Sequence, residues 1–123
     1  MNKLKYNKNS PEAIIRLLYA MAYADKFISD EEIKIITKIE KNYSVSKDTS
    51  ANIIEDIKNN DISEIFKSSI QLIEKEELRK KSLSWLGELA TSDHILHENE
   101  LYFLQIVAER WGMFVPSLKS LNE

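Results

Sequence analysis

Two stretches of the sequence pair an aspartate with a glutamate seven positions later: Asp25 with Glu32, and Asp93 with Glu100. Carboxylates that gather in one place repel one another unless a cation lies between them. Oxygen ligands of this kind suit hard cations such as calcium, magnesium or manganese. These four residues are therefore the candidate metal ligands of the chain, and a divalent ion is the candidate cofactor.

Three further side chains are secondary candidates for the same site. Glu31 precedes Glu32, while His94 and His97 accompany the second acidic stretch. Imidazole nitrogen is a frequent zinc ligand, so zinc joins the candidate ions. The two histidines straddle an expected helix start, however, and exposed surface histidines are the simpler interpretation.

A structural role for the acids is the alternative. Ser29-Asp30-Glu31-Glu32 fits a capping box, in which an acid stabilises a helix start without any metal. Asp25 could likewise accept hydrogen bonds from free amides of the following helix. The stretch is not an EF-hand loop, because Phe27 stands where that loop needs an oxygen ligand and the interior glycine is missing. Spacing alone leaves both interpretations open.

Other chemistry is poorly supported. The chain has no cysteine and a net charge of −3, which excludes thiolate sites and gives no general attraction to nucleic acid. It lacks a nucleophile elbow, a glycine-rich phosphate loop and a zincin motif. Its aromatic residues recur at helical spacing, which favours core packing over stacking on an organic cofactor: Trp85, Tyr102, Phe103 and Trp111. We therefore expect neither catalysis nor an organic cofactor.

The elements that must position the acids are helices. Only two glycines and two prolines interrupt the sequence, and no segment alternates with period two for long enough to indicate a strand. Apolar spacing and cap residues predict helices over about 10–24, 29–43, 47–58, 62–73, 75–91 and 98–111, with Gly112 as the last C-cap and a short seventh helix from Pro116. In the second helix, Ile33, Ile36, Ile39 and Tyr43 should face the core.

The chain also repeats itself. A shift of 68 residues (93 − 25) superposes the two acidic stretches and their flanking helices without a gap. Leu18 then falls on Leu86, and Tyr43 on Trp111. The agreement through the turn is more specific than the apolar matches, because any two amphipathic helices agree at some offset. It predicts two helix–turn–helix units about a pseudo-twofold axis, with both acidic turns at one end of an all-α bundle.

No linker divides the sequence, so we expect a single domain over residues 1–123, with a core of about 11–112 and an N-terminal tail of 1–9. The tail has lysines but lacks the apolar run of a signal peptide, and no stretch approaches the length of a membrane span. We expect a cytoplasmic location without membrane insertion.

The stretch from Leu18 to Asp25, with Ile28 and Glu31-Glu32 after it, resembles the first half of the TerB-like family. The second half of such domains is similar to Leu89-Ala90 through Asp93 and Glu100, ending in an aromatic–glycine pair like Trp111-Gly112. The family includes the tellurite-resistance protein TerB and the N-terminal domain of DjlA-type membrane co-chaperones. The resemblance covers roughly residues 11–112.

This resemblance implies a bundle of six to seven helices, and a divalent-metal site at Asp25, Glu32, Asp93 and Glu100. It implies a non-catalytic role in tellurite, metal or envelope-stress response, with a protein partner such as a membrane-associated stress-response complex. The family usually has glycine directly after each aspartate, where this chain has Lys26 and His94. A lysine ammonium beside the carboxylates could replace a cation. The competing hypothesis is a protein-interaction module with capping acids, able to form a homodimer.

Overall fold

The computed structural model describes residues 8–24, 28–92 and 98–113. Within these ranges the chain is all-α, as the sequence predicted. The helices are α1 (Pro11–Ala22), α2 (Asp30–Asn42), α3 (Lys47–Lys58), α4 (Ile62–Leu72), α5 (Glu76–Thr91) and α6 (Glu98–Trp111). None of the described helices is long and apolar enough to cross a membrane. The seventh helix expected from Pro116 lies outside the described residues.

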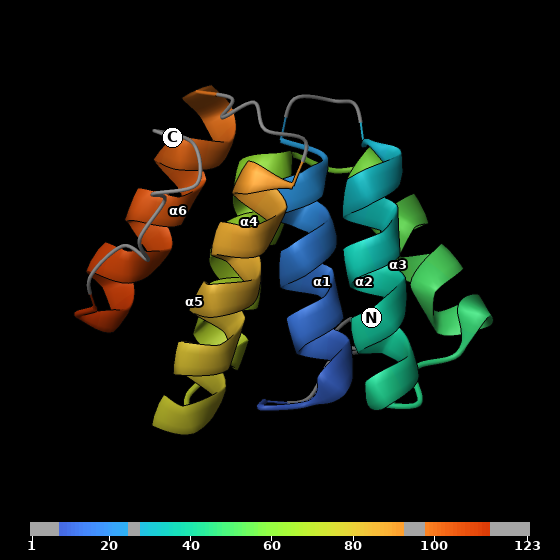
Figure 1. Cartoon of the computed structure of the whole chain (residues 1–123), viewed down its shortest axis with the longest axis horizontal. Coiled ribbons are helices and arrows are strands. Elements are labelled where there is room, and N and C mark those ends of the chain that lie inside the picture. The colour runs from blue at the N-terminus through green and yellow to red at the C-terminus, as the bar shows by residue number, and fades with distance from the viewer. Residues whose placement is uncertain (1–7, 25–27, 93–97, 114–123) are drawn as a thin grey trace.

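The helices form two layers (Figure 1). α6, α5, α1 and α2 lie side by side in that order, while α3 and α4 lie behind them and pack on α1. α1 and α5 run in one direction, and α2 and α6 run in the other (Figure 1). The unit α1–α2 is therefore related to the unit α5–α6 by a pseudo-twofold axis between α1 and α5. The predicted internal symmetry is confirmed.

α1 is the central helix of the bundle. It contacts each of the other five helices of the described structure, and every residue from Ala13 to Ala22 is buried. A helix that is surrounded on all sides needs apolar residues all round rather than one apolar stripe. That explains why the run from Ala13 to Ala22 is hydrophobic throughout except for Arg16, its one charged residue.

Side-chain caps mark the starts of α1, α2, α3 and α4. The Ser10 hydroxyl accepts a hydrogen bond from the Ala13 amide, and Pro11 occupies the first helical position of α1. Ser46 caps α3 in the same way through the amide of Thr49. At the other end of the chain, Gly112 has φ +66, the left-handed conformation that glycine adopts at low cost. The helix boundaries were predictable because these local signals are strong.

Candidate metal site at the helix ends

The two candidate glutamates occupy equivalent places. Glu32 is the third residue of α2 and Glu100 is the third residue of α6. The N-terminal ends of both helices lie at the same end of the bundle, where α1 and α5 terminate (Figure 1). The fold thus directs two first-turn carboxylates, one from each pseudo-symmetric unit, to one end of the molecule.

Glu32 belongs to the capping box that the sequence predicted. Its amide donates to the Ser29 hydroxyl over 3.1 Å, and the Ser29 amide donates back to Glu32 Oε1 over 2.9 Å. The Ser29 hydroxyl also donates to Oε1, at 3.3 Å. Both bonds to the carboxylate end on the same oxygen, so the box itself does not use Oε2. The capping box therefore uses one of the two carboxylate oxygens of Glu32.

The burial of Glu32 was not expected from its type. Its side chain is only 4% exposed, whereas the neighbouring Ile33 is 41% exposed. The prediction that Ile33 faces the core is therefore wrong. The buried side of α2 passes through Glu32, Ile36 and Ile39, and Ile33 lies about 100° further round the helix. The helix is oriented so that an acid, and not the adjacent isoleucine, enters the interior.

The second unit repeats this arrangement. Glu100 is 2% exposed, whereas Tyr102, two positions later, is 60% exposed. The 68-residue register places His97 where the first unit has Ser29. The second turn therefore lacks the serine hydroxyl on which the first capping box depends.

The remaining candidates divide into two groups. Glu31 is exposed, which removes it from the buried end of the bundle. Asp25, Asp93, His94 and His97 lie outside the described residues. Among the residues that the structure does describe, no three acidic or histidine side chains gather closely enough to hold a metal ion. The described residues contribute two carboxylates, and any further ligands would have to come from the turns.

The donor chemistry fits a hard divalent cation. Removing an ionised carboxylate from water costs several kcal/mol unless it is compensated. Two such groups at one end of a bundle also repel each other. Carboxylate oxygen is the ligand that calcium, magnesium and manganese prefer, and a bound cation would offset both costs. Glu32 and Glu100 would hold the ion.

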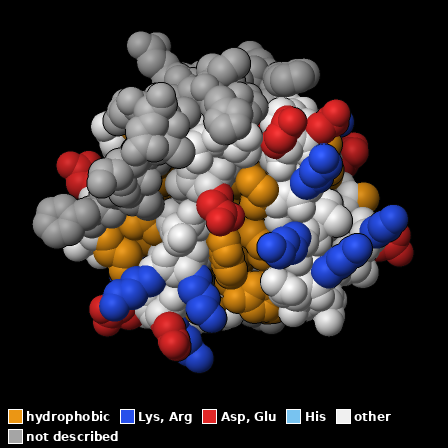
Figure 2. All heavy atoms as spheres, viewed as in Figure 1, with side chains coloured by type: hydrophobic (Ala, Val, Ile, Leu, Met, Phe, Trp, Pro, Cys, Tyr) orange, Lys and Arg blue, Asp and Glu red, His pale blue; other side chains and the backbone are white. Residues whose placement is uncertain are grey.

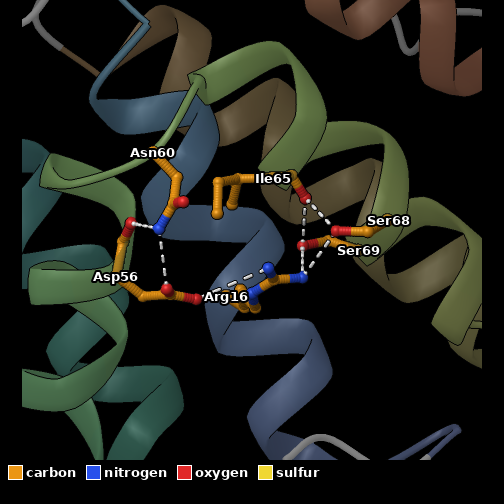
Figure 3. A network of polar contacts seen from close by, with 6 residues as sticks. All are labelled: Arg16, Asp56, Asn60, Ile65, Ser68 and Ser69. Atoms are coloured by element: carbon orange, nitrogen blue, oxygen red, sulfur yellow. Dashed lines mark hydrogen bonds and ion pairs between the residues drawn. The ribbon is translucent and has the colours of Figure 1, made fainter. Parts of the chain in front are cut away.

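A second polar cluster surrounds Arg16 in the interior (Figure 3). Its guanidinium donates from Nη1 to the hydroxyls of Ser68 and Ser69, at 2.8 and 3.1 Å, and Nη2 lies 3.6 Å from Asp56 Oδ2. These partners come from α4 and α3, so one α1 side chain ties the rear layer to the central helix. A single arginine within an otherwise apolar helical run indicates, from the sequence, a buried charge that needs polar partners on other helices. These partners lie on helices that pack against α1, which supports a structural role for the cluster.

A third cluster joins α1, α2 and α3. The Tyr19 hydroxyl donates to Glu40 Oε2 over 2.9 Å, and the Ser50 hydroxyl donates to the same oxygen. Burial, followed by the hydrogen bond and charge of Glu40, raises the pKa of the Tyr19 phenol above its usual value. This contact could not be predicted from the sequence, because Glu40 lies in a polar stretch of α2 that is typical of an exposed surface.

Comparison with known protein families shows to which family the chain belongs. The family model for tellurite resistance protein TerB matches residues 11–114, which is most of the chain. The chain belongs to the TerB family. The proposed resemblance is thus confirmed, and the TerB match spans both helix–turn–helix units as well as α3 and α4 between them.

One solved structure shares the TerB-family fold of this chain. It is the crystal structure of PG1108, a protein of unknown function from Porphyromonas gingivalis W83. The TM-score is 0.60 at 20% sequence identity, covering 98% of this chain and 95% of that one. At this identity the similarity concerns the fold alone. No curated protein matches the chain.

Proposed function

We propose that this TerB-family domain is non-catalytic and binds a divalent cation between its two acidic turns. Glu32 and Glu100 supply buried carboxylates, and Asp25 and Asp93 complete the ligand set. The role that follows from the family is in the response to tellurite, other metals or envelope stress, exercised with a protein partner rather than on a substrate.

The observation that supports this proposal is the burial of two equivalent acids. Each glutamate is the third residue of its helix, and each is at most 4% exposed. An acid placed there only to complement the helix dipole would be equally effective on the exposed side of the first turn, as Glu31 is. Burial of both acids adds a desolvation cost that a cation offsets.

The alternative function is an interaction module whose acids are only caps. The capping box at Ser29 and Glu32 favours it for the first turn. Replacing the glutamates by glutamine distinguishes the two proposals, because the glutamine amide can complete a capping box but carries no charge. The cap-only proposal therefore predicts that Glu→Gln changes little and that ions have no effect.

The test is thermal melting of the full chain with calcium, magnesium, manganese or zinc. An ion at 100 times its dissociation constant adds about 2.7 kcal/mol of stability. That raises the melting temperature of a chain of this size by roughly 10 °C. The double variant Glu32→Gln plus Glu100→Gln should lose this rise, while melting without added ion at the same temperature or higher.

Glu31→Gln is the matched control, since it removes one first-turn charge from an exposed position of the same helix. It should keep the full ion effect. Absence of a rise with all four ions, or a rise that survives in the double variant, would refute the cation site.

A further inference from the structure

A groove with both apolar and polar walls runs along the front of the molecule between α2 and α5. It encloses a hollow of about 380 Å³. Its walls are formed by Ile35, Lys38, Ile39, Asn42, Trp85, Glu88 and Thr91. Figure 2 shows the groove as a strip of hydrophobic side chains with acidic and basic side chains beside it.

The pseudo-twofold axis relates this groove to another one, between α6 and α1. That second groove is filled. α4 packs along α1, and its Phe66 stacks on Phe103 of α6 with ring centres 4.3 Å apart and planes inclined by 20°. α4 lies behind the front row of helices, on the opposite side from the open groove (Figure 1). Among the described residues, the bundle thus contains two equivalent grooves, of which one is covered by a helix of the chain and the other is not.

The residue register supports the equivalence. A shift of 68 places Ile35 on Phe103 and Ile39 on Val107. Phe103 is buried under α4, whereas Ile35 is only half-buried. The α2 wall of the open groove therefore carries the counterparts of residues that receive α4 on the other side.

The open groove differs from the filled one in charge and in an aromatic side chain. Lys38 replaces Ile106, Glu88 replaces Ala20, and Trp85 replaces Leu17. Lys38 and Glu88 are exposed on opposite walls. Neither belongs to an ion pair within the described part of the chain. An occupant that carries both signs of charge beside an apolar stripe would complement these walls.

We propose that the α2–α5 groove is a docking site for an amphipathic helix of a partner protein, of the chemistry that α4 shows. Such a helix has apolar residues at helical spacing and an aromatic anchor, as α4 has at Ile65, Phe66 and Ile70. An acid and a base flank this stripe in α4, at Glu64 and Lys67. The aromatic anchor would lie against Ile35 and Trp85. The groove lining includes none of the four acids of the proposed cation site, so this proposal does not depend on the cation.

The probe is a capped, fluorescently labelled peptide with the sequence of residues 61–74, titrated with the full chain and followed by anisotropy. We expect saturable binding with one peptide per chain. Ile35→Gln should weaken it at least about tenfold, because it removes apolar contact at the centre of the groove. Lys38→Glu, which makes both walls acidic, should weaken it as well.

Ile33→Gln is the matched control: the same substitution two positions away on α2, at an exposed residue outside the groove. It should bind the peptide like the parent chain, and thermal melting should show that all three variants remain folded. A lack of saturable binding up to about 1 mM peptide, or equal losses in Ile33→Gln and Ile35→Gln, would overturn the proposal.

Two other occupants would also overturn it. If sedimentation velocity shows a dimer that Ile35→Gln dissociates and the peptide displaces, the groove is filled by a second copy. If the peptide binds only after Leu118→Gln plus Leu121→Gln, the groove is filled by the chain's own C-terminal segment. Binding to the parent chain as a monomer distinguishes the partner helix from both.

Discussion

At the scale of residues, the TerB-family domain is marked by polar side chains that are buried in specific surroundings. Arg16 and Tyr19 lie on the central helix and find partners on α2, α3 and α4. Each buried polar group would destabilise the core without its partner, so these contacts fix how the layers dock. Glu32 and Glu100 differ in position, because they are buried in the first turns of α2 and α6 at one end of the bundle.

Tyr19 gives the chain a specific sensitivity to alkali. Its pKa in the folded state is raised, so the folded chain holds the phenolic proton more tightly than the unfolded chain does. The resulting stability is complete below the ordinary tyrosine pKa of about 10 and is lost as the pH rises above it. We expect Tyr19→Phe to reduce this alkaline loss in urea unfolding between pH 8 and pH 11.

Tyr19→Phe should also cost about 1 kcal/mol at neutral pH, because Glu40 loses one donor. Tyr102→Phe, at an exposed ring, serves as the control and should keep the alkaline loss of the parent chain. Identical alkaline slopes for Tyr19→Phe and the parent would contradict this account.

At the scale of elements, the two helix starts at Ser29 and Ser46 differ in what they support. Both serines cap a helix through the amide three residues later. The Ser29 hydroxyl also donates to the buried Glu32, whereas the Ser46 hydroxyl reaches only the side chain of Thr49 at an exposed cap. The first cap therefore combines a helix start with the solvation of a buried charge.

This difference predicts unequal costs of the same substitution. Ser46→Ala should lower the free energy of unfolding by about 1 kcal/mol, the usual cost of losing an N-cap. Ser29→Ala should lower it by about 1 kcal/mol more, because a buried carboxylate also loses a donor. Urea titration of both variants checks the difference, and equal costs would mean that Glu32 does not depend on the Ser29 hydroxyl.

At the scale of the whole molecule, the pseudo-twofold axis makes the two units comparable. Leu18 of α1 and Leu86 of α5 coincide in the 68-residue register, and both are fully buried beside the axis. The symmetry is broken outside this pair of hairpins, because α3 and α4 cover only the rear of the bundle. The central contacts should therefore be energetically alike, while the two outer grooves are not.

We expect Leu18→Ala and Leu86→Ala each to cost about 2–5 kcal/mol, the range for truncating a buried leucine. Their values should agree within about 1 kcal/mol if the two sites pack alike. Ile33→Ala, at an exposed position, should cost under about 0.5 kcal/mol. Chemical unfolding measures all three, and a much larger cost at one leucine than at the other would show that the axis is not reflected in the packing.

The positions of the helices, several of their caps and the internal repeat could all be predicted from the sequence. These features depend on residues close together in the chain: Ser29 with Glu32, the left-handed Gly112, and apolar residues three or four apart. The ungapped register was enough to predict that α2 and α6 begin at the same end of the bundle. Local interactions and spacing carry this information without knowledge of any distant contact.

Which side of each helix faces inward depends on how the helices pack, and this could be seen in the three-dimensional structure but not in the sequence. Hydrophobicity placed Ile33 inside and left the position of Glu32 open, but packing against α1 buries Glu32 and exposes Ile33. Likewise, Ile35 and Phe103 are equivalent in sequence, yet α4 covers one and leaves the other beside an open groove. Whether such a residue is buried depends on which distant helix packs against it. The sequence repeat does not predict the position of α4.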